Sequence, residues 1–303
     1  MNKLKKFFKN ISQQTSYLKE SFDPFTLFST PYNTIAEQRI TAFTRRRLFF
    51  ALSLLITFLI IYGMLFYVFK PNIILKDTTA ANGGDMGAHN YIAKFFIDEL
   101  FPNFRMTGWD MGWFAGTPMF TFYFPLPYFL MALLSKIFVY NISFKLVTIL
   151  GSLILPAAIY FFGKSFKFKY PYPELASIGA IAFLYMDSFI AYGANFLGTL
   201  VGEFSYSISF GLVFIFLALL YRGMEKGRFG WLFALNSVIL ACIVLTHLIT
   251  LIALLVIVPS VFFLNRSWKS ARYIIAVFII GFFLSAFWCL PFVLLVKWTP
   301  PLQ

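Results

Sequence analysis

Long apolar runs separated by short basic clusters are the feature that most constrains the fold of this 303-residue chain. The first run, residues 48–69, is long enough for a helix to cross a bilayer core of about 30 Å. Charged residues make up only 12% of the chain, whereas soluble domains contain about 25%. No soluble core of this size could bury the 42 phenylalanines. The sequence therefore predicts an all-α integral membrane protein.

The formal net charge of +13 would suggest a nucleic-acid partner if the chain were soluble. Here the basic residues lie between apolar runs, where they set membrane orientation, so we expect no nucleic-acid partner. Nine of them fall in residues 1–47, which we interpret as a basic cytoplasmic tail on an anionic inner leaflet, either as an interfacial helix or as a disordered segment. Arg45, Arg46 and Arg47 precede the first apolar run and predict a cytoplasmic N-terminus for a multi-pass protein of the plasma membrane.

Residues 48–303 are expected to form one polytopic domain with about seven transmembrane helices. The first loop, residues 70–143, carries five basic and five acidic side chains and is predicted to lie outside, with interfacial or re-entrant helices. Residues 119–140 are long enough to cross, but a crossing there would invert the sidedness of the basic clusters that follow. The predicted crossings are residues 48–69, 145–163, 174–192, 204–222, two short helices within 230–264, and about 272–296.

The stretch Gly83–His89 combines three glycines with a carboxylate and an imidazole. Glycines let the backbone approach a ligand closely. If a helix begins near Met86, Asp85 is positioned to cap it, and His89 lies one turn further on the same side. The stretch is therefore either an ordinary glycine-rich turn with a helix cap or a ligand-binding site.

Asp110 lies between Trp109 and Trp113 in a turn-rich stretch, residues 107–118. Tryptophans are common at membrane interfaces and need no function there. Beside an aspartate in a glycine-rich loop, they also resemble a platform on which a sugar ring stacks. Both interpretations stay open at the level of sequence.

Three further ionisable residues fall at or near the same predicted outer face. Asp187 lies within the predicted crossing 174–192, where an ionisable group is either functional or hydrogen-bonded to a neighbouring helix. Glu203 is the only acidic residue in the next predicted outer loop. His247 marks the expected break within residues 230–264, because a continuous helix of 35 residues would be about 52 Å long.

Several short motifs in residues 75–298 resemble a family of large bacterial membrane proteins labelled 6-pyruvoyl-tetrahydropterin synthase-related. These motifs are Gly84-Asp-Met-Gly-Ala-His89, Thr107-Gly-Trp109, Phe122-Tyr-Phe-Pro-Leu-Pro127, Phe144-Lys-Leu-Val147 and Gly202-Glu-Phe-Ser205. A pterin synthase itself needs a zinc site of three histidines, and this chain has only two histidines. Members of the family continue beyond this length, so the resemblance also implies a fragment truncated at its C-terminus.

The order of a basic tail, one span, a long outer loop with an early aspartate and then closely spaced spans is similar to the GT-C superfamily of membrane glycosyltransferases. That resemblance implies transfer of a sugar from a polyprenyl-phosphate donor on the extracytoplasmic face. It implies Asp85 as base or metal ligand, Glu203 or Asp187 as the acid of the next outer loop, and a divalent cation as a possible cofactor between Asp85 and Glu203. The candidate substrate-binding residues are His89, Lys94, Arg105, Trp109, Asp110, Trp113, Asp187 and His247.

Two other classes of function fit the same pattern. A transporter or flippase would use Asp187, Glu203 and His247 as a relay through the membrane, although the sequence has no convincing internal repeat. A non-catalytic assembly protein could also keep a GT-C-like scaffold, because a fold does not determine a function.

Overall fold

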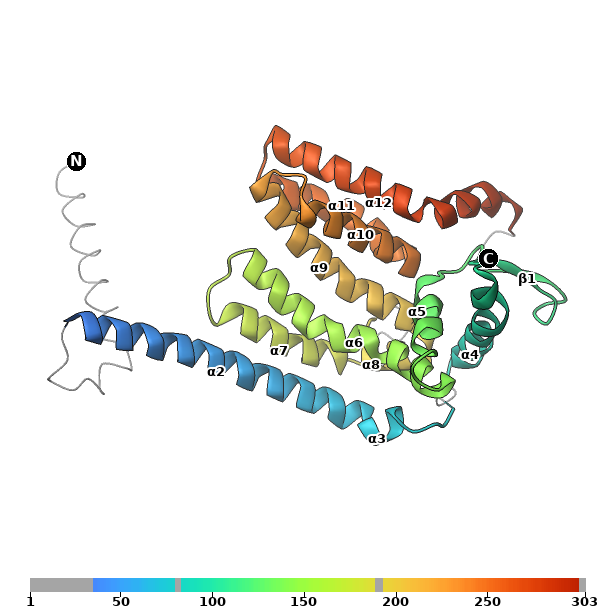
Figure 1. The fold of residues 1–303 in the computed structure, drawn as a ribbon, viewed down its shortest axis with the longest axis horizontal. Helices are drawn as coiled ribbons and strands as arrows, with labels where there is room; N and C mark the ends of the chain where they lie inside the picture. Colours follow the sequence, from blue (N-terminus) through green and yellow to red (C-terminus); the bar gives the residue numbers. More distant parts are fainter. Residues whose placement is uncertain (1–34, 80–82, 189–192, 300–303) are drawn as a thin grey trace. The chain divides into compact units, whose positions relative to one another are not determined.

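A computed structural model describes residues 35–79, 83–188 and 193–299, with side chains from Thr44 onward (Figure 1). Residues Met1–Phe58 and Leu59–Gln303 form two separate compact units, and the first long helix runs through the boundary between them. Most of the predicted basic tail lies outside the described residues. The elements are α2 (Ile35–Phe69), α3 (Pro71–Ile74), α4 (Met86–Phe95), η2 (Phe96–Leu100), η3 (Phe101–Asn103), β1 (Gly108–Asp110), β2 (Thr117–Met119), α5 (Leu126–Leu134), α6 (Tyr140–Ser165), α7 (Tyr172–Leu184), α8 (Phe196–Gly198), η4 (Thr199–Glu203), α9 (Phe204–Lys226), α10 (Trp231–Thr246), α11 (Leu248–Leu264), α12 (Trp268–Leu295) and η5 (Val296–Trp298).

The described residues contain four helical stretches that are long and apolar enough to cross a membrane. Helices α7, α10 and α11 are apolar but shorter. The helical membrane-protein class is therefore supported, with the short antiparallel pair β1–β2 as the one sheet in the described ranges. The number of crossings stays a prediction. The four long stretches are Thr44–Phe69, Tyr140–Ser165, Phe196–Lys226 and Trp268–Trp298.

Helix α5 is the only α-helix within residues 119–139, and it has nine residues. At 1.5 Å per residue it is about 13 Å long, well below the bilayer core of about 30 Å. Pro125 and Pro127 lie at its start, where proline is tolerated because the first amides of a helix have no intrahelical partner. The segment therefore does not contain a membrane-spanning helix, in agreement with the sequence prediction.

Helix α7 is shorter than predicted, because it ends at Leu184 and the expected crossing continued to residue 192. Beyond the helix, the buried side chain of Asn195 donates a hydrogen bond to the carbonyl of Met186, at 2.6 Å. Met186 and Asp187 themselves are not helical. Asp187 consequently lies in an exposed, non-helical position, and its predicted place inside an apolar helix is wrong.

The predicted break at His247 is confirmed. Helix α10 ends at Thr246 and α11 begins at Leu248, while His247 itself is extended, with φ −167° and ψ 124°. The hydroxyl of Thr250 donates to the carbonyl of His247, at 2.6 Å. This hydrogen bond ties the first turn of α11 to the residue at the break.

Helices α6 and α9 form the most closely packed pair of long helices, and small residues make this possible. A side chain added at Gly151 of α6 would collide with the backbone of Ser207 and Ile208 in α9. Close approach through glycine and serine is the usual way for membrane helices to pack.

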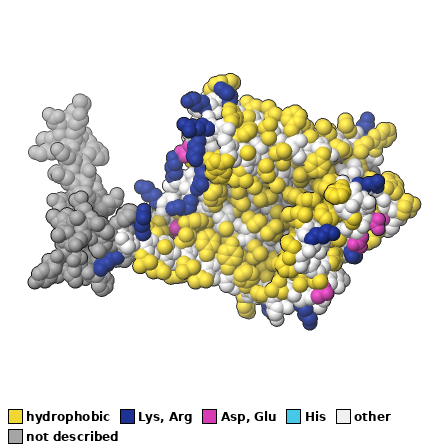
Figure 2. Space-filling model, in the orientation of Figure 1, with side chains coloured by type: hydrophobic (Ala, Val, Ile, Leu, Met, Phe, Trp, Pro, Cys, Tyr) yellow, Lys and Arg dark blue, Asp and Glu magenta, His cyan; other side chains and the backbone are white. Residues whose placement is uncertain are grey.

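The two helices also run in the same direction, so that their C-terminal ends lie together. The Arg222 guanidinium in α9 lies 4.5 Å from the Phe161 ring centroid in α6, and Lys167 pairs with Glu225. Gly227, just after α9, lies against Lys269 at the start of α12. The basic clusters that follow α6, follow α9 and precede α12 therefore gather at one end of the helices, as Figure 2 shows.

The opposite end contains a cluster of buried aromatic side chains from α4, η2, α5 and the first turns of α6 and α9. Phe96, Tyr128 and Phe204 are fully buried in it. Their burial fixes the positions of α4 and of the start of α9, which carry the residues considered next.

Candidate functional site

The segment Gly83–His89 meets the segment that precedes α9. The backbone amide of Asp85 donates to the carbonyl of Val201, at 2.7 Å. Gly84 has φ +51°, and a Cβ atom there would collide with the same carbonyl. Glycine is therefore required at position 84, both for its backbone conformation and for the close approach.

Gly202 completes this junction from the other side. It has φ +134°, and a Cβ atom built there would lie 3.1 Å from the Cβ of Asp85 and 3.1 Å from Nε2 of His89. The two glycine-containing motifs thus pack directly on each other, although they are far apart in the sequence.

Asp85 occupies the N-cap position of α4, and the helix begins at Met86 as predicted. Its side chain nevertheless makes no capping hydrogen bond, and it is exposed. The interpretation of Asp85 as an ordinary helix cap is therefore wrong.

Glu203 occupies the N-cap position of α9 and likewise makes no capping hydrogen bond with its side chain. It is half-buried, and its carboxylate lies close enough to Asp85 for the two negative charges to repel each other. Paired carboxylates of this kind suit general acid–base chemistry or the binding of a divalent cation.

His89 is buried, with 6% of its surface exposed, and its Nδ1 atom is hydrogen-bonded to the Tyr128 hydroxyl at 2.7 Å. Burial lowers the pKa of the imidazole to about 4, while the nearby Asp85 carboxylate and a backbone hydrogen bond to Gly202 oppose this effect. The ring is consequently neutral near pH 7.

Tyr123 joins His89 and Tyr128 to Glu203. Burial raises the pKa of its phenol to about 12, and the carboxylate of Glu203 acts in the same direction, while a hydrogen bond to Tyr128 opposes both. The sequence analysis missed Tyr123 and Tyr128 as site residues. Both lie in or just after the motif of residues 122–127, where hydroxyls within an aromatic run were the available signal.

His247 lies on the far side of the same cluster. Its ring centroid is 4.7 Å from that of Phe124 and 5.3 Å from that of Tyr206. Tyr206 in turn lies near Glu203. Nδ1 of His247 is buried and has no hydrogen-bond partner among the described residues. The structure therefore connects both histidines to Glu203 through aromatic side chains.

The predicted residues of the β1–β2 hairpin do not join this cluster. Asp110 is buried, with 6% exposed, and accepts a hydrogen bond from the Gly112 amide at 2.8 Å, which is a local turn contact. Trp109 is 62% exposed, whereas Trp113 is half-buried against Tyr91, with ring centroids 5.1 Å apart. The two tryptophans consequently do not form one open platform around Asp110.

The remaining candidates are also separate from the paired carboxylates. Lys94 forms an exposed ion pair with Asp98 at 3.0 Å, one helical turn away. Arg105 is exposed. Asp187 lies beyond the end of α7.

The described part of the chain contains no group of three or more histidine, cysteine, aspartate or glutamate side chains that could hold a metal ion. Asp85 and Glu203 form a pair. Mg²⁺ is commonly held by one or two carboxylates together with substrate phosphates, so the pair fits a cation that arrives with a phosphorylated substrate.

Comparison with known proteins identifies one family. Residues 120–302 match the family described as 6-pyruvoyl-tetrahydropterin synthase related domain, membrane protein. No curated protein and no solved structure matches the chain. The match includes Glu203 and His247 but begins after Asp85 and His89. Since it covers more than half of the sequence, the chain belongs to the 6-pyruvoyl-tetrahydropterin synthase related family of membrane proteins.

Proposed function

We propose that this protein is a GT-C-like membrane glycosyltransferase that moves a sugar from a polyprenyl-phosphate donor to an acceptor hydroxyl. The observation that carries the proposal is the junction at which Val201 and Gly202 bring Asp85 beside Glu203. The two carboxylates come from distant segments, and Glu203 lies at the start of α9, whereas a basic cluster lies at the end of the same helix.

The reaction forms a bond from the acceptor oxygen to the anomeric carbon and breaks the bond from that carbon to the donor phosphate. Asp85 is exposed and takes the proton of the acceptor hydroxyl. Glu203 is half-buried beside it and orients the acceptor. A divalent cation held by both carboxylates would stabilise the negative charge of the departing phosphate.

The neighbouring side chains limit which residue meets the phosphate. His89 is neutral near pH 7, because its pKa is lowered to about 4 by burial, and it therefore serves as a hydrogen-bonding support for the junction. Lys94 is already paired with Asp98. Arg105 is exposed but separate from the paired carboxylates, so we assign none of these three candidates to the phosphate.

The proposal places the protein in the plasma membrane with its N-terminus in the cytoplasm and its basic clusters against an anionic inner leaflet. The carboxylate pair then faces the extracytoplasmic side, where a lipid-linked donor presents its sugar.

Substitution of single carboxylates in full-chain protein tests the assignment. Asp85→Asn keeps size and hydrogen bonding but removes the charge, and asparagine is itself a good helix cap. Transfer from polyprenyl-phosphate sugars should fall by about a hundredfold or more, the scale of general base catalysis. Glu203→Gln should do likewise, and the double variant should be no worse than either single one, because the groups act as a unit.

Asp98→Asn is the matched control, since Asp98 is an exposed carboxylate on the helical segment that follows α4. It should retain activity. Wild-type transfer by Asp85→Asn, with normal insertion into the membrane, would contradict the catalytic assignment.

One observation favours a second function, that of a non-catalytic assembly protein. The β1–β2 hairpin and the residues before it expose large apolar side chains: Phe104 is 98% exposed, Phe114 87% and Met111 70%. Exposed apolar patches commonly mark protein interfaces. Under this alternative, replacement of Phe104 and Phe114 by serine would impair assembly, whereas Asp85→Asn would have no effect.

A further inference from the structure

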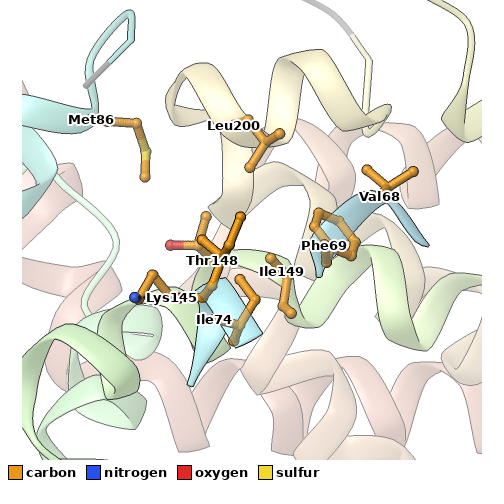
Figure 3. Close-up of a pocket in the computed structure, with 9 residues that line it drawn as sticks. Val68, Phe69, Ile74, Met86, Lys145, Thr148, Ile149 and Leu200 are labelled. Carbon is orange, nitrogen blue, oxygen red and sulfur yellow. Dashed lines mark hydrogen bonds between the residues drawn. The ribbon is translucent and has the colours of Figure 1, made fainter. Parts of the chain in front are cut away.

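A cavity of about 200 Å³ lies next to the carboxylate junction (Figure 3). Met86, which follows Asp85, and Leu200, which precedes Val201, both line it. In Figure 3 these two side chains face Thr148 of α6 across the space. The end of α2, the short helix α3 and two further residues of α6 form the rest of the wall. The cavity and the carboxylate pair therefore share one structural element, the contact between Asp85 and Val201.

The lining is apolar apart from Lys145 and Thr148. The Thr148 hydroxyl donates to the Phe144 carbonyl of its own helix, at 2.9 Å. The Lys145 ammonium donates to the carbonyls of Ile73 and Lys76, at 2.8 and 2.7 Å, and so ties the segment that contains α3 to α6. Because these polar groups are engaged with backbone, a ligand inside the cavity is held mainly by apolar contacts.

The size of the cavity suits a hydrocarbon chain. If each methylene takes roughly the 30 Å³ of a water molecule, the space holds about seven carbon atoms of a chain. Around a membrane protein, the hydrocarbon chains of lipids are the abundant apolar groups that are narrow enough for such a space.

Two lysines lie at the ends of the cavity wall. Lys70 precedes α3 and Lys76 follows it, both are exposed, and the wall residues Ile73 and Ile74 lie between them. The positive-inside rule does not account for them, because the basic clusters gather at the other end of the helices. Exposed lysines at a membrane surface attract anionic phosphate groups.

We propose that the cavity takes a segment of one hydrocarbon chain of a lipid whose phosphate headgroup lies against Lys70 and Lys76. The apolar lining selects the chain, and the two lysines select an anionic head. This site is independent of the sugar transfer proposed above. Phospholipids and polyprenyl phosphates share the required chemistry.

Photolabelling of the full chain in phosphatidylcholine nanodiscs tests the proposal. The probe is a phosphatidylglycerol with a photoreactive group on its hydrocarbon chain, and labelled peptides are identified by mass spectrometry. We expect labelling of the peptides around Thr148 and Leu200. Leu200→Trp fills the cavity and should abolish this labelling, whereas Leu200→Ala enlarges it and should preserve the labelling, which separates filling from misfolding.

Removal of the lysine charges tests whether the two lysines bind the headgroup. Lys70→Gln combined with Lys76→Gln should weaken probe binding by about tenfold or more, since each lysine near a membrane surface contributes about 1 kcal/mol and 1.4 kcal/mol is tenfold. Lys136→Gln, an exposed lysine elsewhere in the same predicted outer loop, is the matched control and should leave binding unchanged.

Competition with unlabelled lipids distinguishes the sources. Displacement by both phosphatidylglycerol and polyprenyl phosphate identifies a general site for phosphate-headed lipids, and displacement by polyprenyl phosphate alone identifies a site for that lipid. Two results together would overturn the proposal. Labelling around Thr148 would be no stronger than labelling of the exposed apolar face of α12, and Leu200→Trp would not reduce it.

Discussion

At the scale of single residues, burial determines what His89 can do. The imidazole is enclosed by Tyr123, Tyr128 and Phe204, with ring-centroid distances of 5.8, 6.3 and 5.0 Å. An enclosed ring loses the solvation that would stabilise a positive charge, so its pKa falls to about 4. His89 consequently supports the junction as a neutral hydrogen-bonding group.

This burial predicts how stability depends on pH. The folded-state pKa of His89 is about 4 and the ordinary value is 6.5, so the unfolded chain takes up a proton that the folded chain does not. The stabilisation is complete above pH 6.5 and is lost as the pH falls toward 4. The loss should reach roughly 3 kcal/mol, from about 1.4 kcal/mol per pKa unit. This loss of stability is measured by unfolding the protein in detergent at several pH values between 7 and 4, with tryptophan fluorescence as the signal.

His89→Gln serves as the comparison, since glutamine does not titrate in this range. The acid-dependent loss of stability should be smaller in the variant than in the natural protein. Identical pH profiles for the two proteins would show that His89 is not enclosed.

At the scale of elements, two glycine-containing segments form the junction. Phe96–Leu100, after α4, is a single turn of π-helix. The segment Thr199–Glu203, before α9, is kinked at Gly202, which has φ +134°. This kink allows Gly202 to pack against Asp85 and His89.

The two glycines of the Gly84–His89 motif allow a matched comparison. Gly84→Ala introduces a Cβ atom at φ +51°, against the Val201 carbonyl, and should cost about 2 kcal/mol of stability together with most of the transfer activity. Gly87→Ala adds a methyl group that meets nothing within 4 Å on a helix, and should stabilise by up to about 1 kcal/mol. Thermal unfolding and transfer assays on both variants measure the contrast. Equal effects of the two changes would count against the junction.

At the scale of the whole molecule, charge separates the two ends of the unit formed by residues from Leu59 onward. Basic clusters gather where α6 and α9 end, and the carboxylate pair lies where α9 begins. A positive end of this kind faces the cytoplasm in most membrane proteins. The proposed donor, a polyprenyl-phosphate sugar, would then approach from the extracytoplasmic side.

Single cysteines test this orientation. Phe168 and Ser188 lie beyond opposite ends of α7, and both are exposed. Ser188→Cys and Ala88→Cys should react with a membrane-impermeant maleimide in intact cells, whereas Phe168→Cys should react only after permeabilisation. The unsubstituted protein contains Cys242 and Cys289, which are half-buried. Its reaction with the maleimide measures the background labelling. Outside labelling of Phe168→Cys would reverse the predicted sidedness.

Local patterns in the sequence were sufficient to predict the helical class, the start of α4 at Met86 and the break at His247. Each of these features follows from hydropathy, helix length and nearby glycine residues, which act within a few turns of one helix. The same reasoning failed for Asp187, because α7 ends at Leu184, before the apolar run in the sequence ends.

Only the tertiary structure decided which of the candidate residues meet. Asp85 and Glu203 are neighbours because Gly84 and Gly202 allow two distant segments to touch, and no local pattern in either segment encodes its partner. Asp110 has the same residue type and a similar glycine-rich context, yet it is buried in a turn of its own hairpin. The physical reason is that a side chain's chemistry depends on burial and neighbouring charge, and the packing of helices far apart in the sequence determines both.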